Sequence, residues 1–598
     1  MTLYLSHYNA FTMKKFFPEM IFNHRLFLYL TLISVCIFFH SCKNDPKGNE
    51  VSVGLSGEPD GLNPITSAGQ AYSRQVCERH IFCSLGDTDP NTLAFTPFLS
   101  KADAEITPID MGNLKGGTSY TYEILEEAKW DNGEPVTGYD FEFTIKTILN
   151  PKVNAAVWRG YLDFIKVVRV DNQNPRKITI MTDKKYILAK DAIENMPILP
   201  EYIYDSEKVM RKYSIDMFQD KSKMEELAND AALSAFAKQF NNNFNREKDK
   251  IVGCGPYQLE QWENGQRIVL KKKEDWWGNA LMSSRPALAA YPDRLIYRFY
   301  GNMQTQLADL KAQNLDVMST IPAADFKKLQ ADPEFSKQYG LYVQPSYTYS
   351  YLSLNTRNPI LEDVNTRKAL AFAIDVDGII SNILEGMAVR MNSIVLPVKE
   401  YNRKDLQPIP FDIQKAKIML AEAGWKDSDN NGILDKKING KNTELKLNFL
   451  IPNKAPLPEL ALLVQNSVKE AGIRLNPVAK DFNVIKEDIK NKNFEIAYTA
   501  KGGNPSLDDF EQSWHSTKGS NDTGFGNPAM DELIEQMNST LDAGARNQLY
   551  GKFQQLIYDG QPVILLTNAK ERIAISKRFP NAHPSLLRPY FFEQSFQK

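Results

Sequence analysis

Hydrophobic and polar residues follow two kinds of pattern in the first half of the chain. Short apolar or alternating runs predict strands over Val51–Leu55, Ser119–Leu125, Lys177–Met181, Ile268–Lys272 and Leu295–Tyr300. Thr137–Ile148 begins with a turn and continues with apolar side chains on one side, which predicts a helix.

From Gly301 onward the pattern changes to alternating helices and strands. Thr305–Gln313 is an amphipathic stretch that leads into an apolar run at Leu315–Met318. Asn365–Leu384 is predicted to form one long helix, and Phe411–Ala423 another that ends at a glycine, as helices often do.

A regular succession of elements follows. Strand, helix, strand, helix and strand are predicted over Leu445–Leu450, Pro458–Ala471, Ile473–Val478, Asp481–Lys490 and Phe494–Tyr498. Such a βαβαβ run indicates a parallel sheet. Because ligands of these sheets lie beyond the carboxyl ends of the strands, we expect a site in the loop after Tyr498.

The N-terminal segment has the features of an export signal. Leu26–Phe39 is an uncharged apolar run preceded by Lys14, Lys15 and Arg25. It is too short to cross about 30 Å of hydrocarbon but suits a signal peptide. The run ends at Ser41-Cys42, which resembles the lipobox of bacterial lipoproteins, although Phe39 and His40 are unusual there. We expect removal of residues 1–41 and lipidation of Cys42; an ordinary buried cysteine is the alternative.

The composition narrows the possible functions. The 598 residues carry 71 Lys+Arg and 73 Asp+Glu, and this balance argues against a nucleic-acid binder, which needs a basic face. Only His80, His515 and His583 lie beyond residue 41, which argues against a histidine-rich metal centre. Three cysteines after Cys42 do not make a disulfide framework, and we expect no bond between Cys77 and Cys83.

Catalytic and phosphate-binding motifs are absent from the sequence. We therefore expect no enzyme and no cofactor or metal. Asp427–Asp435 matches the first nine positions of a calcium loop, but Ile438 stands where the bidentate glutamate belongs. A polar turn before a strand is the simpler interpretation.

Tyrosines and small polar residues alternate from Tyr347 to Asn355. The period of two places Tyr347, Tyr349, Tyr351, Ser353 and Asn355 on one face of a strand. That face either lines a wet ligand cleft, where aromatic rings stack and hydroxyls donate, or packs in a sheet with its hydroxyls at the rim.

Several segments, taken in order, resemble the family 5 extracellular solute-binding proteins, the oligopeptide- and dipeptide-binding components of ABC importers. They are Glu58–Pro64 (EPDGLNP), Trp130–Phe141 (WDNGEPVTGYDF), Gly253–Tyr257 (GCGPY), Tyr351–Asn355 followed by Val364–Asp375 (VNTRKALAFAID), and Ala421–Trp425 (AEAGW). Cys254 replaces the threonine that is usual in the third segment. Together these segments span nearly the whole chain after Cys42.

The resemblance implies an α/β fold of the periplasmic-binding-protein type II: a clamshell of two lobes joined by a hinge, plus an extra domain II. Domain I would comprise residues 42–88, 197–300 and 559–598, domain II residues 89–196, and domain III residues 301–558. Pro562–Leu566 would be the strand that re-enters domain I. Binding would close the hinge, and a permease would recognise the closed form.

The implied function is capture of a peptide or peptide-like solute for an ABC permease. We expect a monomer in the periplasm or on the cell surface of a bacterium, attached to the membrane by lipid and not binding nucleic acid. A cell-surface peptide-binding lipoprotein that acts as a sensor or chaperone without an importer is the first alternative. A degraded hydrolase is the second.

Peptide binders of this family carry G-W-x-x-D-Y-x-x-P, in which the aspartate pairs with the peptide's α-ammonium. Alignment on Pro505 puts Tyr498 at the tryptophan, Lys501 at the aspartate and Gly502 at the following tyrosine. Asp508 or Asp509 could take over that role in a rearranged loop, and Lys501 could instead be a solvated lysine at the rim.

The ligand-binding residues that we expect are Tyr347, Tyr349, Asn355, Tyr498, Lys501, Gly502, Gly503, Asn504, Asp508, Trp514 and His515. Trp514 is either a stacking platform or a core anchor, and His515 either contacts the ligand or is only hydrogen-bonded. A lysine at position 501 would repel an α-ammonium, so the ligand group there should be anionic or neutral.

Overall fold

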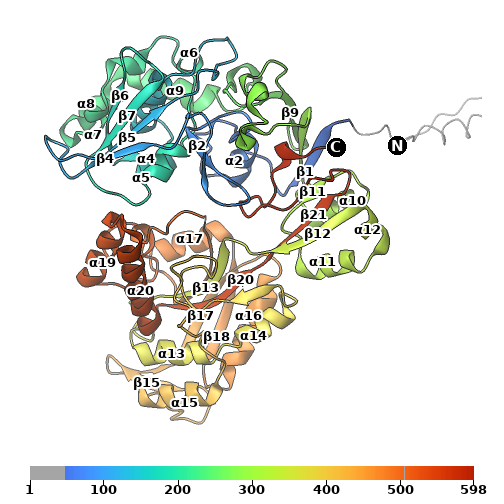
Figure 1. The fold of residues 1–598 in the computed structure, drawn as a ribbon. Helices are drawn as coiled ribbons and strands as arrows, with labels where there is room; N and C mark the ends of the chain where they lie inside the picture. Colours follow the sequence, from blue (N-terminus) through green and yellow to red (C-terminus); the bar gives the residue numbers. More distant parts are fainter. Residues whose placement is uncertain (1–47, 504) are drawn as a thin grey trace, which may run out of the picture. The chain divides into compact units, whose positions relative to one another are not determined.

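The computed structural model describes residues 48–503 and 505–598 (Figure 1). The predicted signal peptide, the lipidation site Cys42 and the predicted ligand residue Asn504 lie outside the described residues. Within those residues, no helix combines the length and the apolar character needed to cross a bilayer.

A seven-stranded sheet brings both ends of the described chain together (Figure 1). Its strands, in spatial order, are β12 (Tyr339–Gln344), β21 (Glu571–Ser576), β11 (Val317–Met318), β1 (Glu50–Leu55), β10 (Arg294–Phe299), β9 (Arg267–Lys272) and β8 (Tyr257–Glu263). The strands predicted around residues 51–55, 268–272 and 295–300 are therefore confirmed. Helices that accompany this sheet in sequence are α2 (Ala71–Cys77), α10 (Met303–Lys311), α11 (Ala323–Gln330) and α12 (Pro333–Gln338).

A four-stranded antiparallel sheet forms from the segment between β1 and β8. Its order is β4 (Glu105–Pro108), β5 (Thr118–Glu123), β7 (Lys177–Thr182) and β6 (Ile165–Val170). The predicted helix is α3 (Gly138–Leu149), whose start is fixed by a capping box between Thr137 and Asp140. Phe141, Ile145 and Ile148 are fully buried, as their spacing predicts. The remaining elements of this segment are β2 (Gly86–Thr88), β3 (Phe95–Pro97), α4 (Ala156–Leu162), α5 (Ala189–Glu194), α6 (Glu201–Tyr204), α7 (Ile215–Gln219), α8 (Met224–Asn229) and α9 (Ala231–Asn243).

A six-stranded sheet contains the predicted parallel run. Its order is β14 (Ala388–Arg390), β20 (Val563–Ala569), β13 (Thr348–Leu354), β19 (Ile496–Gly502), β17 (Lys446–Pro452) and β18 (Arg474–Lys480). β17 pairs in parallel with both β18 and β19, so the βαβαβ prediction is confirmed. The connecting helices are α16 (Leu457–Lys469) and α17 (Phe482–Lys490). The other elements here are α15 (Ile413–Glu422), β15 (Asp435–Ile438), β16 (Lys441–Glu444), α18 (Glu511–Trp514), α19 (Pro528–Ser539) and α20 (Ala543–Gly560).

The long helix predicted over Asn365–Leu384 is wrong. Two helices occupy this region, α13 (Val364–Phe372) and α14 (Val376–Asn382). The carboxylate of Asp375 accepts a hydrogen bond from the backbone N–H of Gly378 at 2.8 Å. This side chain is an N-cap, which begins a new helix rather than continuing the old one.

The prediction that Pro562–Leu566 re-enters domain I is also wrong. β20 pairs with β13 and β14 in the six-stranded sheet. It is the next strand, β21, that pairs with β11 and β12 in the seven-stranded sheet. A continuous apolar run marks a strand buried on both faces but does not say which sheet it joins. The domain ranges themselves stay a prediction.

Candidate functional site

Lys501 lies on β19, where the strand pairs with β13. The register places Lys501 opposite Tyr349 and Thr499 opposite Tyr351. Since side chains alternate between the two faces of a strand, these four residues share one face of the sheet. The rings of Tyr349 and Tyr351 lie 5.6 Å apart between centroids. The tyrosine pattern and the lysine therefore belong to the same surface.

The Lys501 ammonium is placed among polar and aromatic groups. Its Nζ donates to Ser513 Oγ at 3.1 Å and lies 5.7 Å from the centroid of the Phe510 ring. Burial lowers the pKa of Lys501, and nearby aspartates act in the opposite direction. Among the described residues, no carboxylate oxygen comes within the 4.0 Å of an ion pair with this Nζ. Because an ammonium has three N–H donors, Lys501 can donate to a bound carboxylate or carbonyl oxygen.

The two aspartates that follow in the loop accept hydrogen bonds from the protein itself. Asp508 accepts from Tyr401 Oη at 3.0 Å, and one of its oxygens lies 3.9 Å from Lys399 Nζ. Asp509 accepts from Tyr186 Oη and from Asn538 Nδ2, each at 2.9 Å. Both carboxylates thus already have donors, which leaves them less suited to replace the amino-anchoring aspartate.

Lys399 is a buried lysine that the sequence pattern does not reveal. Its side chain donates to the backbone carbonyls of Pro505, at 3.3 Å, and of Ser506. Burial lowers the pKa of Lys399, with Asp508 acting against it. These bonds fix the loop that follows β19, and with it the surroundings of Lys501. No local spacing links a lysine in the segment before α15 to this loop.

The residues next to Lys501 along the chain approach the start of β13. The backbone N–H of Gly503 donates to the carbonyl of Tyr347 at 2.5 Å, and Gly502 pairs with Thr348. The side chains of Tyr347 and Tyr349 pack in an apolar cluster with Met391 and Leu396. The predicted group of Tyr347, Tyr349, Lys501, Gly502 and Gly503 is therefore brought together.

Tyr498 and Asn355 lie apart from this group. Tyr498 pairs with Leu352, which places it on the opposite face of the sheet from Lys501. Asn355 Nδ2 donates to the carbonyls of Lys492 and Phe494, at 3.1 and 2.9 Å, and so stabilises a loop. Their role as ligand contacts stays a prediction that this arrangement does not favour.

Trp514 and His515 are both enclosed by protein. Trp514 is 5% exposed and packs against Phe553 with 6.3 Å between ring centroids. His515 is 4% exposed, with Nε2 at 3.4 Å from a Glu535 oxygen and Nδ1 at 3.6 Å from an Asp531 oxygen. These contacts favour the core anchor for Trp514 and the hydrogen-bonded histidine for His515, and their ligand role also stays a prediction.

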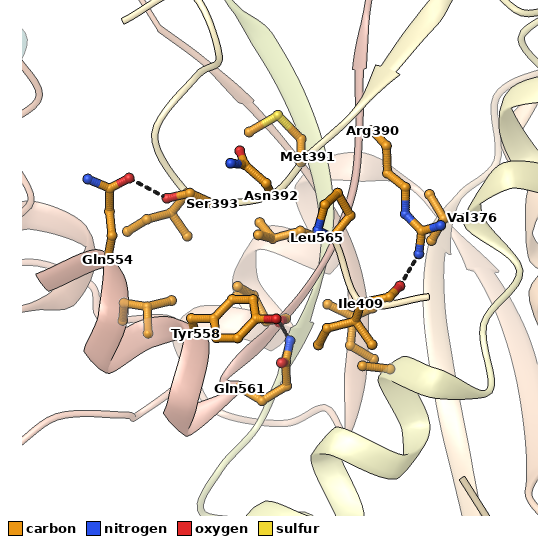
Figure 2. A pocket seen from close by; sticks show the side chains of 16 residues that line it. Val376, Arg390, Met391, Asn392, Ser393, Ile409, Gln554, Tyr558, Gln561 and Leu565 are labelled. Atoms are coloured by element: carbon orange, nitrogen blue, oxygen red, sulfur yellow. Dashed lines mark hydrogen bonds between the residues drawn. The ribbon is translucent and has the colours of Figure 1, made fainter. Parts of the chain in front are cut away.

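Two hollows lie away from Lys501. Figure 2 shows the first, lined by residues of α14, α20, β20 and the segment after β14. At about 30 Å³ it has room for one or two water molecules and not for a peptide. Its polar groups include Ser393 Oγ, which donates to Gln554 Oε1 at 2.7 Å (Figure 2). The second, of about 210 Å³, lies beside α3, and its charged side chains pair with one another, as Glu201 does with Arg211.

The calcium-like loop is organised by hydrogen bonds to its own backbone. The Asp427 carboxylate accepts from the N–H groups of Asn431 and Gly432, at 3.1 and 3.0 Å. Asp435 accepts from Ser428. In the part of the chain that the structure describes, no group of three or more histidine, cysteine, aspartate or glutamate side chains is arranged to hold a metal ion. These bonds support the polar turn.

Comparison with known proteins gives a consistent assignment. The model of the bacterial extracellular solute-binding proteins, family 5 Middle, matches residues 113–524. Over 567 residues the chain is 24% identical to the oligopeptide-binding protein AppA of Bacillus subtilis, covering 92% of this chain and 94% of AppA.

Two solved structures share the fold. AppA of Bacillus subtilis in complex with a nonapeptide is 23% identical with a TM-score of 0.69, covering 92% of this chain and 99% of that one. NikA of Brucella suis in complex with Fe(III)-EDTA is 18% identical with a TM-score of 0.72 and the same two coverages. The chain shares with them a mixed α/β fold whose several sheets form lobes.

Proposed function

Because the chain belongs to the bacterial extracellular solute-binding proteins of family 5, we propose that it captures a peptide-like solute beside Lys501 and delivers it to an ABC permease. The family consists of solute-binding proteins that act outside the cytoplasm, and it is not a family of enzymes. The proposal covers three things: the chemical class of the solute, the permease that receives it and the lipid anchor at Cys42.

The positive charge of Lys501 is the main argument for the chemical class of the solute. In the ungapped match anchored on Pro505, Lys501 stands where family members that bind free peptides carry an aspartate that attracts the peptide's α-ammonium. Two like charges about 4 Å apart repel by about 4 kcal/mol at an effective dielectric constant of about 20. Replacing an attractive aspartate by a repulsive lysine changes the interaction energy with the α-ammonium by roughly twice that amount. Even if movement of water and side chains leaves only about 3 kcal/mol of this, the affinity for a free peptide falls about a hundredfold. The solute should therefore present a carboxylate or a neutral carbonyl to Lys501.

The surroundings of Lys501 fit such a group. Tyr351, which is half-buried, provides aromatic surface on the same face of the sheet beside the buried ring of Tyr349, and Thr499 adds a hydroxyl that lies 3.0 Å from Ser353 Oγ. An anion bound here would favour the charged form of the lysine, against the burial that lowers its pKa. The relatives also support a wide choice of solutes, because AppA binds a nonapeptide and NikA binds the iron complex of EDTA, a polycarboxylate.

Calorimetry with two matched peptides tests the proposal. Trialanine carries a free α-ammonium, whereas N-succinyl-trialanine carries a carboxylate at the same end. The wild-type chain should bind the succinylated peptide at least about tenfold more tightly. Lys501→Asp should reverse the preference, and Lys501→Met should abolish it.

Lys490→Asp is the matched control, because it makes the same change of charge at a side chain that is 72% exposed on α17. It should leave both affinities unchanged. If trialanine binds the wild type with micromolar affinity and Lys501→Asp leaves that affinity unchanged, Lys501 does not contact the solute. Mass spectrometry of small molecules released from the gently denatured protein would then identify the class of solute directly.

A further inference from the structure

Cys83 and Cys254 lie on two segments whose backbones are in direct contact. The N–H of Gly255 donates to the carbonyl of Ile81, and the N–H of Tyr257 donates to that of His80, both at 2.8 Å. A Cβ added to Gly253 would lie 2.2 Å from the Ile81 oxygen, and one added to Gly255 would lie 2.4 Å from the His80 oxygen. The glycines on both sides of Cys254 therefore let its backbone lie against that of residues 80–81 at a distance where a side chain would clash.

The two side chains lie in the same apolar core. Cys83 is 2% exposed and Cys254 is fully buried, and both belong to one hydrophobic cluster. Burial raises the pKa of the Cys83 thiol, and the neighbouring Cys254 thiol raises it further. The third described cysteine, Cys77, lies on α2 beside Arg74 and Glu78. The three thiols are free in the structure.

We propose that Cys83 and Cys254 form a disulfide bond in the exported protein, and that the structure represents its reduced form. Extracytoplasmic proteins fold where disulfides form and persist. A disulfide needs Cβ atoms about 3.8 Å apart and an S–S bond of about 2.05 Å. Because the backbones beside the two cysteines are already hydrogen-bonded to each other, changes of side-chain rotamer with small backbone shifts would bring the two sulfurs to that distance.

The oxidation requires a disulfide as co-reactant, either a small molecule such as glutathione disulfide or an oxidised protein dithiol. The thiolate of one cysteine attacks this disulfide, forms a mixed disulfide and expels one reduced thiolate. The second cysteine thiolate then attacks the mixed disulfide and expels the other. Two thiol protons and two electrons leave the pair, and the co-reactant becomes two thiols. Because the folded core excludes reagents, the bond must form before the core closes.

The bond would join two points that flank the four-stranded sheet in sequence. All of that sheet and helices α3 to α9 lie between Cys83 and Cys254. The segment around Cys254 is already held in place, because the indole N–H groups of Trp276 and Trp277 donate to its carbonyl at 2.9 and 2.8 Å. The covalent link would therefore join the two ends of the segment that forms the four-stranded sheet, and it would restrict the unfolded chain.

Peptide mapping tests the proposal, because trypsin separates the three cysteines. Cleavage after lysine and arginine places Cys77 in Gln75–Arg79, Cys83 in His80–Lys101 and Cys254 in Ile251–Arg267. The full chain, refolded in glutathione buffer containing glutathione disulfide, is denatured, alkylated without reduction and digested. We expect the second and third peptides to be linked, with a mass two hydrogens below their sum, and the first to be alkylated.

Three variants complete the experiment. Cys77→Ser should keep the link, whereas Cys254→Thr, which introduces the residue usual in this motif, should leave Cys83 alkylated. Dithiothreitol should lower the midpoint of thermal unfolding of the wild type and of Cys77→Ser by several degrees, and the double variant Cys83→Ala/Cys254→Thr should not respond. Complete alkylation of all three wild-type peptides before reduction, or a link through Cys77, would overturn the proposal.

Discussion

Glu593 and His80 are two ionisable side chains facing each other in the core beneath the seven-stranded sheet. Glu593 is 2% exposed and accepts a hydrogen bond from Tyr297 Oη at 2.8 Å, and His80 Nε2 lies 3.9 Å from the same oxygen. Burial raises the pKa of Glu593 to about 7, against the opposing charge of Arg79, and lowers the pKa of His80 to about 3. At neutral pH the histidine is therefore uncharged.

The first prediction is that Glu593 makes the protein less stable as the pH rises. Between its unfolded value of 4.5 and about 7, this carboxyl binds more protons in the folded chain than in the unfolded chain. The free energy of unfolding therefore falls as the pH rises through this range. Glu593→Gln should remove this contribution, which amounts to about 3 kcal/mol between pH 4.5 and 8.

Denaturant unfolding at several pH values measures the difference. His80 acts with the opposite sign below pH 6.5 and is present in both proteins, so the comparison between them isolates Glu593. Glu487→Gln, at a side chain that is 67% exposed, should leave the pH dependence unchanged. Equal slopes for wild type and Glu593→Gln would show that Glu593 stays ionised in the folded core.

For single residues, the sequence predicts which side chains share a face of one strand better than it predicts contacts between residues that are far apart in the chain. Tyr349 and Tyr351 share a face because the strand period of two is a local property. Tyr498 was grouped with Lys501 by the motif match, although three residues of separation put them on opposite faces of β19. Lys399 and Tyr401 reach the same loop from about one hundred residues earlier, as their hydrogen bonds show, and no local pattern carries that information.

At the scale of elements, the ends of two helices show how a glycine in the left-handed conformation terminates a helix. Gly424 follows α15 with φ +86°, and Gly472 follows α16 with φ +77°. The sequence predicts Gly424 as the glycine that ends its helix, and the left-handed conformation explains the choice of residue at both positions. Their surroundings differ, because a Cβ at Gly472 would lie 2.6 Å from Leu434 Cγ, whereas one at Gly424 would meet nothing closer than 3.7 Å.

We predict that this difference appears in stability. Gly424→Ala should lower the free energy of unfolding by about 1 kcal/mol, the usual cost of a left-handed conformation for a residue with a Cβ. Gly472→Ala carries the same backbone cost and must also displace a side chain, so its total should reach about 2 to 3 kcal/mol. Urea titrations of the two variants measure this, and equal losses would mean that Leu434 moves aside freely.

The division between α13 and α14 shows why the boundaries of elements are harder to predict than their type. Apolar side chains continue from Ala369 to Ile374 with helical spacing, which favours one helix. The competing signal is a single aspartate, Asp375, whose carboxylate accepts from the N–H of Gly378. The hydrophobic pattern fits one long helix and two short helices equally well, and the single capping side chain decides between them.

For the whole molecule, the sequence predicted the strands and the parallel run but not the return path between sheets. β20 and β21 are both buried and separated by a single residue, yet each pairs in a different sheet. The pattern of apolar residues is the same for either sheet, and the choice depends on which partner strands are available. Distant pairing therefore limits what a single sequence reveals.

Membrane attachment is a prediction about the whole molecule that depends on Cys42. The apolar run that ends at this cysteine motivates the lipid anchor. Cys42→Ser should convert a protein that requires detergent for extraction into one released from membranes, because the substitution removes the site of the acyl chains that would hold the processed chain. Fractionation of cells producing each form measures this, and wild-type protein that is extracted without detergent would contradict the anchor.

The last prediction concerns closure on the solute. Residues just before α5 contact the region that follows Lys501: Tyr186 Oη donates to Asp509 at 2.9 Å, and the N–H of Ile187 donates to the carbonyl of Asn538 at 2.9 Å. Hydrogen bonds to an ionised carboxylate contribute about 1.5 to 3 kcal/mol. If these contacts form only when the lobes close around a solute, their loss weakens binding without touching the solute.

Tyr186→Phe removes one of these bonds and keeps the ring. The affinity for N-succinyl-trialanine should fall by about tenfold, since part of the bond energy is recovered by water. Small-angle scattering should show the wild-type radius of gyration decrease on adding this peptide, and the variant should need a higher peptide concentration for the same decrease. Tyr161→Phe, at a side chain 50% exposed on α4, is the matched control and should behave as the wild type. If Tyr186→Phe binds and scatters as the wild type does, the contact with Asp509 is present in the open form too and plays no part in closing.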